Sequence, residues 1–444
     1  MQTNFTPEQL ADPHVAESET ILRKCVHCGF CTATCPTYVE LGNELDSPRG
    51  RIYLIKEMLE NGRAADRETV THIDRCLSCL SCMSTCPSGV NYMHLVDHAR
   101  VHIEKTYRRP FLDRLVRTVL AHVLPYPGRF RLALKFAKLG RPFIPLFRAT
   151  PGLKPVASML ELAPANVPSA QAPHAAKAAG ETRGRVALLS GCAQSVLDPG
   201  INAATVRLLA KFGIEIVAPE GEGCCGALVH HMGREEQALD FARSNIDAWT
   251  RLIENGGLDA ILITTSGCGT TIKDYGHMLR LDPVYAGKAA RVSALAKDIT
   301  EYLATLDLPE PEVSPGLTVA YHSACSMQHG QKITRQPKAL LTRAGFTVKE
   351  PREGHLCCGS AGTYNILQPE ISRRLRDRKV KNIEATGAVA IATGNIGCIT
   401  QIASGSKLPI VHTVELLDWV HGGPRPRGIP KPSRRAEKAG AVAA

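Results

Sequence analysis

Two runs of cysteine share one spacing, and thiolates at this spacing are typical ligands of iron–sulfur clusters. Each run reads Cys-x2-Cys-x2-Cys-x3-Cys-Pro, once over residues 25–36 and once over residues 76–87. In such a pair the fourth cysteine of each run reaches the cluster held by the other run. We therefore predict two [4Fe–4S] clusters, one on Cys25, Cys28, Cys31 and Cys86, and a second on Cys76, Cys79, Cys82 and Cys35. Two neighbouring clusters indicate electron transfer.

Zinc and disulfides are the alternatives for these cysteines. Structural zinc sites also use four cysteines, but usually as Cys-x2-Cys pairs, so the spacing favours iron–sulfur clusters. The chain starts MQTNFTPEQLADP, without an apolar signal segment. We therefore expect a cytoplasmic protein with reduced thiols. No stretch approaches eighteen consecutive apolar residues, and we predict no transmembrane helix.

Eight further cysteines form a second, repeated set. Cys192 and Cys325 are 133 residues apart, and the Cys-Cys-Gly sequences that follow them are separated by the same 133 residues. A repeat with matched cysteines in order indicates a duplicated unit. These second-tier candidate metal ligands are Cys192, Cys224, Cys225, Cys268, Cys325, Cys357, Cys358 and Cys398. Further iron–sulfur clusters, thiol–disulfide chemistry and inert buried thiols all remain open for them.

The elements around these cysteines alternate between strands and helices. In the first unit, apolar strand patterns cover 186–192, 214–219 and 259–265, with helical patterns over 202–212 and 234–253. The second unit repeats the order with strands over 317–325, 346–350 and 388–393. This alternation predicts parallel sheets, in which the carboxyl ends of the strands line the ligand site. Each set of four cysteines should therefore converge.

The chain divides into six predicted regions. Residues 1–100 form an α-helical two-cluster domain, with a helix over 49–61 between the two cysteine runs. The α/β repeats cover 185–310 and 311–422, so the fold class is multi-domain, α+β with α/β. Between them and the first domain lie a basic amphipathic helical connector (101–150) and an Ala/Pro-rich linker (151–184). A basic disordered tail (423–444) ends the chain.

The net charge of +11 is concentrated in the connector and the tail. Residues 101–150 hold eleven Lys or Arg and two acidic residues. A basic amphipathic segment is typical of a membrane-surface or partner contact, and equally of a packed connector with solvated charges. No nucleic-acid-binding motif is present, and we predict no nucleic-acid partner.

No residue of the chain is predicted to be catalytic. The sequence has no Ser–His–Asp order, P-loop or GxGxxG after a strand, so no nucleotide or flavin site is expected on this chain. Several histidines follow the predicted strands, and we expect them to be hydrogen-bonded structural residues. They are His230, His231, His322, His329 and His355.

The motifs resemble those of a known family, the iron–sulfur subunits of bacterial glycolate oxidase (glycolate dehydrogenase). The resemblance extends from about residue 18 to about 420, and its most specific parts are CVHCGFCTATCPTY (25–38), HLCCGSAGTYN (355–365) and NIGC (395–398). It implies a two-cluster ferredoxin-type domain followed by two Cys-Cys-Gly repeats. It also implies FAD-containing glycolate oxidase partner subunits that oxidise glycolate to glyoxylate, and transfer of electrons to quinone or another acceptor at the cytoplasmic face of the inner membrane.

Two other resemblances supply alternatives. The architecture is similar to iron–sulfur subunits of D-lactate and anaerobic glycerol-3-phosphate dehydrogenase complexes. The Cys-Cys-Gly repeats also resemble heterodisulfide reductase, which implies an autonomous thiol or disulfide enzyme. In that family a CxxC station supplies a fifth thiolate, whereas this chain has Thr271 and Gln401 at the corresponding positions.

Overall fold

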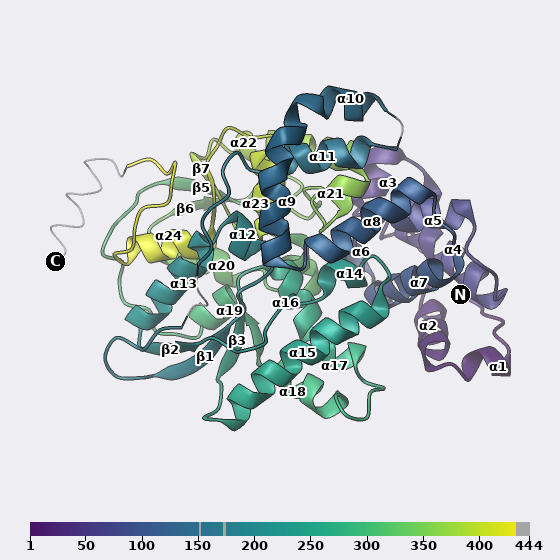
Figure 1. The fold of residues 1–444 in the computed structure, drawn as a ribbon, viewed down its shortest axis with the longest axis horizontal. Helices are drawn as coiled ribbons and strands as arrows, with labels where there is room; N and C mark the ends of the chain where they lie inside the picture. Colours follow the sequence, from purple (N-terminus) through teal and green to yellow (C-terminus); the bar gives the residue numbers. More distant parts are fainter. Residues whose placement is uncertain (151, 172–174, 432–444) are drawn as a thin grey trace.

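The first hundred residues fold into short helices joined by the cysteine loops. The computed structural model describes residues 1–150, 152–171 and 175–431 (Figure 1). Ser47 caps the helix between the two cysteine runs by accepting a hydrogen bond from the Gly50 N–H, and Pro48 occupies its first turn. The elements are α1 (Pro7–Leu10), α2 (Pro13–Arg23), α3 (Pro36–Leu41), the 3-10 helix η1 (Glu44–Asp46), α4 (Pro48–Glu60), α5 (Arg67–Asp74), α6 (Ser81–Thr85) and α7 (Tyr92–Thr106).

The connector is helical, as its amphipathic pattern predicts. Its elements are α8 (Phe111–Val123), α9 (Pro127–Gly140), the 3-10 helix η2 (Arg141–Phe143) and α10 (Ile144–Ala149), and α11 (Lys154–Leu162) follows them. Helix α11 lies within the segment that we expected to be a linker. It forms because Ala157 and Leu160 are buried, so the linker prediction is wrong for this part. Most of the expected tail (432–444) lies outside the described residues.

The two repeats have the same parallel-sheet topology. The strands are β1 (Gly184–Leu188), β2 (Ile214–Val217), β3 (Ala260–Ile263) and β4 (Ala296–Asp298), then β5 (Thr318–Tyr321), β6 (Thr347–Lys349), β7 (Ala390–Thr393) and β8 (Ile410–His412). Their orders are β2-β1-β3-β4 and β6-β5-β7-β8, with every pairing parallel. The predicted fold class is confirmed. The short outer strands β4 and β8 were not predicted.

Helices cover both sheets. Those of the first repeat are α12 (Gln194–Leu197), α13 (Gly200–Lys211), α14 (Ala227–His230), α15 (Glu235–Glu254), α16 (Ser266–Lys273), α17 (Tyr275–Met278), α18 (Ala286–Leu295) and α19 (Ile299–Leu303). Those of the second are the π-helix η3 (Ser326–Gly330), α20 (Gln336–Arg343), α21 (Tyr364–Leu367), α22 (Pro369–Glu384), α23 (Ile396–Ala403) and α24 (Thr413–Val420).

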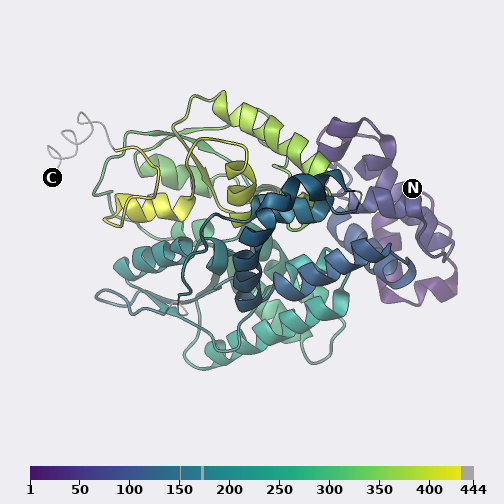
Figure 2. The same cartoon turned by 45° about the horizontal axis from the view of Figure 1, so that its top comes forward.

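The repeats share one hydrophobic core. It joins strand residues of the first sheet, such as Val186 and Leu262, to Val319 and Ala390 of the second. The Ser266 N–H also donates to the Gly394 carbonyl across the junction at 3.2 Å. Figure 2 shows the two repeats one above the other, with the connector in front and the N-terminal helices at one side. The repeats therefore form one packed body rather than two independent modules.

Candidate iron–sulfur and metal sites

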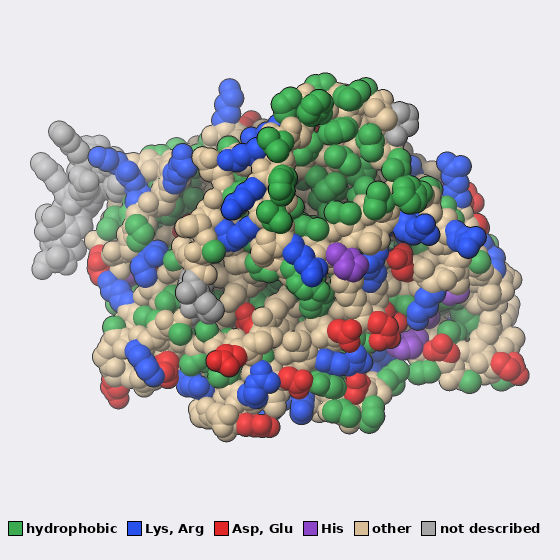
Figure 3. Space-filling view, viewed as in Figure 1, with side chains coloured by type: hydrophobic (Ala, Val, Ile, Leu, Met, Phe, Trp, Pro, Cys, Tyr) green, Lys and Arg blue, Asp and Glu red, His purple; other side chains and the backbone are tan. Residues whose placement is uncertain are grey.

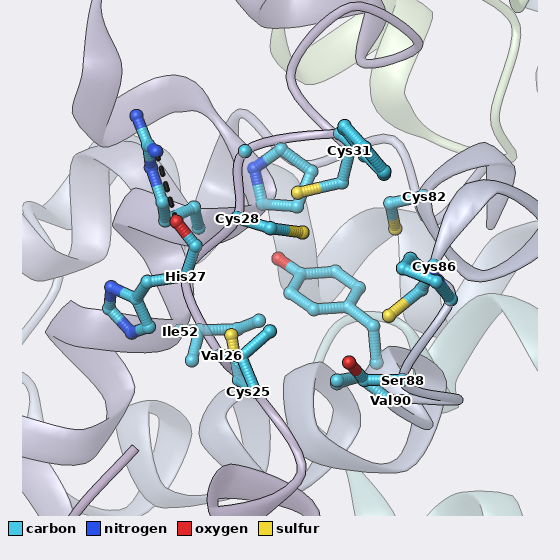
Figure 4. Close-up of a pocket in the computed structure, with 16 residues that line it drawn as sticks. Cys25, Val26, His27, Cys28, Cys31, Ile52, Cys82, Cys86, Ser88 and Val90 are labelled. Atoms are coloured by element: carbon cyan, nitrogen blue, oxygen red, sulfur yellow. Dashed lines mark hydrogen bonds between the residues drawn. The ribbon is translucent and has the colours of Figure 1, made fainter.

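The first cysteine loop encloses a hollow near the molecular surface. Its empty volume is about 450 Å³, part of it open to solvent. The cysteines that line it are Cys25, Cys28, Cys31 and Cys86, with Cys82 in the same wall (Figure 4). Cys28 is exposed. The neighbouring Val26 and Phe30 are 67% and 63% exposed. This hollow therefore has an apolar, accessible rim.

The second cysteine loop encloses a smaller hollow, whose empty volume of about 310 Å³ also includes space open to solvent. The cysteines that line it are Cys76, Cys79, Cys82 and Cys35. The structure thus brings together the two sets of four that the crossed pattern predicts. Cys82 and Tyr92 line both hollows, so the two sites share a wall.

The loops have matched left-handed positions that suit a bulky anionic ligand. His27 and Gly29 have φ of 55° and 83° in the first loop, and Ser78 and Leu80 have φ of 49° and 62° in the second. Non-glycine residues rarely adopt this region. Alternation of right- and left-handed residues turns successive backbone N–H groups toward one concavity, an arrangement found at iron–sulfur sites. The chain therefore fits [4Fe–4S] clusters in both hollows.

Two side chains donate hydrogen bonds to sulfurs of the second hollow. Arg51 Nη1 donates to Cys35 Sγ at 3.7 Å. Tyr92 Oη donates to Cys76 Sγ at 3.7 Å. Arg51 is buried, and its side chain also donates to the His72 carbonyl at 2.7 Å. Donors and a cation at thiolate sulfur stabilise negative charge there.

Burial and thiol–thiol repulsion act on the same cysteines. Burial, and then the neighbouring Cys25, raises the pKa of Cys31 to about 11. Burial likewise raises the pKa values of Cys79 and Cys82 well above their usual range. Such thiols lose their protons only when positive charge takes the proton's place, as a bound metal centre does.

In the first repeat the four cysteines converge at the carboxyl ends of the strands. Cys192 follows β1, and Cys268 lies in α16 directly after β3. In the order β2-β1-β3-β4 the chain passes from β1 to β2 on one side and then crosses to β3 on the other, and ligands bind at the carboxyl ends of two such strands. The neighbouring Cys224 thiol, with burial, raises the pKa of Cys192. Cys224 and Cys225 are buried, whereas Cys192 and Cys268 are partly exposed.

The second repeat places its cysteines deeper. The four members Cys325, Cys357, Cys358 and Cys398 are all buried. Cys325 and Cys357 pack in one apolar cluster with Tyr364, and Cys79 of the second hollow packs against that cluster. The thiols of the second repeat therefore adjoin the N-terminal domain.

The histidines that follow the strands differ in their surroundings. His230 and His231 lie 3.4 and 3.5 Å from the Asp97 carboxylate, and His329 Nδ1 lies 2.9 Å from Ser84 Oγ, as structural residues would. His322 differs, because neither ring nitrogen has a hydrogen-bond partner among the described residues. Burial lowers its pKa to about 3, so the ring is neutral.

Gln401 and Thr271 do not supply the missing fifth ligand. Gln401 is buried and donates from Nε2 to Ser372 Oγ at 2.8 Å, and its Oε1 accepts from Asn365 Nδ2. Thr271 is buried and donates to the Gly267 carbonyl. Both side chains are engaged in local hydrogen bonds.

The sequence did not indicate Arg51 or Tyr92, and the expectation that His322 is hydrogen-bonded is wrong, because neither of its ring nitrogens has a partner among the described residues. Arg51 and Tyr92 lie on helices next to the cysteine runs, but a polar residue on an amphipathic helix is usually solvated, and only the tertiary fold turns these two toward sulfur. For His322 the available signal was its place directly after a strand.

Comparison with known proteins agrees with this geometry. Residues 21–90 match the 4Fe-4S dicluster domain family, and residues 186–273 and 319–403 match the cysteine-rich CCG domain family. The glycolate oxidase iron-sulfur subunit of Escherichia coli (strain K12) is 42% identical over 418 residues, which cover 94% of this chain and 98% of that protein. The chain belongs to the family of glycolate oxidase iron–sulfur subunits.

Other relatives are more distant. The probable glycolate oxidase iron-sulfur subunit of Bacillus subtilis (strain 168) is 32% identical over 89% of this chain and 93% of its own length. Lactate utilization protein A of the same organism is 27% identical and covers 53% of this chain and 99% of its own length. A crystal structure of a hypothetical protein from Helicobacter pylori shares the fold, with a TM-score of 0.54 at 10% identity over 93% of this chain and 73% of that one.

The family and the two hollows together define the chain's role. It carries iron–sulfur clusters in its N-terminal domain and acts in electron transfer, as a component of an oxidoreductase. The recognised resemblance and the fold class are both confirmed. No helix of the described residues is long and apolar enough to span a bilayer.

Proposed function

We propose that this chain carries electrons within a glycolate oxidase complex. Glycolate is oxidised to glyoxylate on the FAD of a partner subunit, and the electrons pass through this chain to quinone or another membrane acceptor. The observation that carries the proposal is the pair of adjoining hollows, the first lined by five cysteines and the second by four, with Cys82 in the wall of both. Two adjoining redox sites form a short electron path.

The proposed ligands follow the crossed pattern. One cluster is held by Cys25, Cys28, Cys31 and Cys86, and the other by Cys76, Cys79, Cys82 and Cys35. Two observations support this division: each hollow is lined by one of these sets, and matched left-handed residues recur in both loops.

The two sites differ in access, which suggests a direction for electrons. The exposed Cys28 and the apolar Val26 and Phe30 suit docking of the flavoprotein beside the first cluster. The second site is covered by the second repeat, where Cys79 packs beside Cys325 and Cys357. We therefore propose that electrons enter at the first cluster and move inward.

An exposed apolar surface on the connector suits the membrane. Phe136 and Leu139 of α9 are 62% and 72% exposed, and Leu146 of α10 is 61% exposed. Figure 3 shows apolar side chains gathered over this part of the molecule. Lys135 and Lys138 are also exposed on α9. A helical surface with exposed apolar and basic residues favours an anionic bilayer surface.

The connector also links that surface to the second repeat. Val116 and Leu120 of α8 pack with Ile366 of α21. Tyr364, on the same short helix, packs with Cys357. Packed side chains therefore connect the cysteines of the second repeat to the connector. This contact supports delivery of electrons to the membrane acceptor near the connector.

The electron path is tested with cysteine variants in the intact complex, purified anaerobically. Cys28→Ala and Cys79→Ala each remove a predicted cluster ligand, so we expect loss of quinone reduction while glycolate still reduces the flavin. Cys192→Ala, in the first repeat, is the matched control and retains quinone reduction. Full quinone reduction by both cluster variants would contradict the proposal.

The substrate is tested with the same preparation. Glycolate-dependent dye reduction together with copurifying flavin is the expected result. The lactate utilization relatives make lactate the second candidate, and glycerol 3-phosphate is the third. Activity on one of these without glycolate activity would keep the electron path and change the substrate.

The membrane contact is tested by cosedimentation with anionic phospholipid vesicles. Phe136→Glu combined with Leu139→Glu should lower the bound fraction at least tenfold, while glycolate-dependent flavin reduction is retained. Leu281→Glu combined with Val284→Glu alters two other exposed apolar residues, 52% and 66% exposed on the first repeat, and should leave binding unchanged. Unchanged binding by the α9 variant, or loss of the flavoprotein from it, would contradict the membrane assignment.

A further inference from the structure

His322 is a buried histidine without a hydrogen-bond partner. Its side chain has no exposed surface, and both Nδ1 and Nε2 lack a partner among the described residues. Burial of an unpaired polar group is unfavourable, so native proteins rarely tolerate it without a ligand or a water molecule. His322 therefore needs a partner that the protein chain does not supply.

The nearest candidate partners are two thiols. The ligand atoms of His322, Cys358 and Cys398 all lie within 4.8 Å of one another, and all three residues are buried. A tetrahedral ion with bonds of about 2.0–2.3 Å to nitrogen and sulfur separates its ligands by about 3.5–3.8 Å. The three atoms are thus close enough to share one ion.

We propose that the second repeat binds one divalent metal ion of the zinc class through His322, Cys358 and Cys398. Mixed imidazole and thiolate ligation suits zinc best, and ferrous iron next. A fourth ligand is available from Cys325 or Cys357, which are buried beside Cys358. This inference does not depend on the proposed partner or substrate.

The spacing separates this site from the cluster sites. Among the described residues, no three cysteines of the N-terminal domain bring their sulfurs within 4.8 Å of one another. They instead lie around two hollows, farther from one another. The N-terminal sulfurs are therefore too widely spaced to give one ion three ligands, whereas the ligand atoms of the second repeat are close enough to do so.

Charge in the second repeat also suits one divalent ion. Lys379 is buried at 2% exposure, close enough to these thiols for their charges to interact, and its Nζ donates to the Glu353 carbonyl at 2.8 Å. Three thiolates, one divalent ion and one lysine ammonium sum to zero. Buried charges are tolerated when they are balanced in this way.

The first repeat provides an internal comparison. Leu189 occupies the position that His322 occupies, because the N–H of each donates to the neighbouring strand, to Leu262 and Ala392 respectively, at 2.9 Å. A leucine cannot bind a metal, so the proposed site belongs to the second repeat alone. The leucine in the first repeat also indicates that the backbone of the second repeat can accommodate leucine in place of His322.

Another histidine group has the spacing but lacks the need for a ligand. Glu17, His94 and His277 also lie within 4.8 Å of one another. Their atoms are already paired, with His277 Nε2 at 2.7 Å from Glu17 Oε1 and His94 Nε2 at 3.0 Å from Asp274 Oδ1. This group is satisfied as an ion-pair network and is not part of the proposal.

The test is metal analysis of the full-length complex, purified anaerobically without chelators or metal-affinity resins. We expect about one zinc (or one extra iron) per chain beyond the cluster iron, with sulfur and nitrogen neighbours in its X-ray absorption spectrum. His322→Leu and Cys398→Ser should each lose this ion and keep the cluster iron. Cys268→Ser, the matched change in the first repeat, should retain it.

Thermal melting gives a second readout that separates a ligand from an unpaired histidine. If His322 binds metal, His322→Leu loses the ion and melts at a lower temperature than the wild type. If it does not, leucine replaces an unpaired buried polar group and the melting temperature rises. A higher melting temperature for His322→Leu would overturn the proposal. So would retention of the ion by both His322→Leu and Cys398→Ser, or the loss from these variants of about four extra iron atoms together.

Discussion

Arg51 should set the reduction potential of the more buried cluster. Its guanidinium lies 3.7 Å from Cys35 Sγ, and its side chain is 1% exposed. A fixed positive charge stabilises the reduced cluster, which carries one more electron. Arg51→Gln removes that charge, while Asp46 keeps its contacts with His72 and Arg75 at 2.8 and 2.9 Å. We therefore expect a lower potential in a protein that still folds.

The magnitude follows from the distance and an effective dielectric constant. Two unit charges about 4 Å apart interact by about 4 kcal/mol at an effective dielectric constant of about 20. The added electron is shared over the whole cluster, so we take about half of this, about 2 kcal/mol. For a one-electron couple, in which a tenfold change in equilibrium constant is about 59 mV, this corresponds to a fall of about 90 mV.

The assay is a redox titration of the anaerobic protein followed by electron paramagnetic resonance. Arg51→Lys keeps the charge and should shift the potential by less than half as much. Arg49→Gln, beside the first loop, where Arg49 donates to the His27 carbonyl at 3.2 Å, should leave the buried cluster unchanged. An unchanged potential in Arg51→Gln, with its iron content intact, would refute the electrostatic reasoning.

Three further predictions concern stability. Gly359→Ala should lower the free energy of unfolding by about 2–3 kcal/mol in thermal melts, and Gly226→Ala by about 1–2 kcal/mol. Both glycines have φ near +85°, which strains any other residue. The added Cβ would also lie 2.5 Å from a backbone oxygen at Gly359, and 3.0 Å from one at Gly226. Burial lowers the pKa of His412 to about 4, below its unfolded value near 6.5. The contribution of neutral His412 to the free energy of unfolding is therefore present above pH 6.5 and lost as the pH falls toward 4. Relative to His412→Gln, the wild type should lose about 2 kcal/mol of that free energy between pH 6.5 and 5 in denaturant titrations. Asp74→Asn removes the partner of Arg109 and Arg117, at 2.7 and 2.8 Å, so limited proteolysis should cut the connector faster than in the wild type.

The sequence predicts the parts of this molecule that depend on local patterns. The spacing of eight cysteines indicates both clusters and their crossed ligation, and the 133-residue offset indicates two equivalent α/β units. The strand patterns of β1, β3, β5 and β7 are long apolar runs because these strands are central and buried on both faces. Such features can be recognised from short runs of residues and from fixed spacings along the sequence.

Long-range contacts leave no such signal. The outer strands β4 and β8 have three residues each, too few for a period-2 pattern to stand out, whereas the equally short β6 was indicated by its place before the repeated Cys-Cys-Gly. Helix α11 forms in an Ala/Pro-rich segment because neighbouring helices bury one of its faces. The packing of Cys79 against Cys325 joins residues 246 positions apart, and no local rule anticipates it.

The two repeats share a topology and both meet the cluster domain through paired charges, but only the second also brings buried thiols to that contact. The first meets it through paired charges, with His277 and Asp274 against Glu17 and His94. The second also meets it through ion pairs, from Arg374 and Arg378 to Glu40, and in addition packs Cys79 against the apolar cluster that contains Cys357. Paired charges in a partly exposed contact position one domain on another, whereas packing of the predicted ligand Cys79 against a cluster that contains buried thiols also shortens the distance that an electron must cross. We therefore expect electrons to move from the second cluster into the second repeat and not into the first, even though each repeat presents four cysteines.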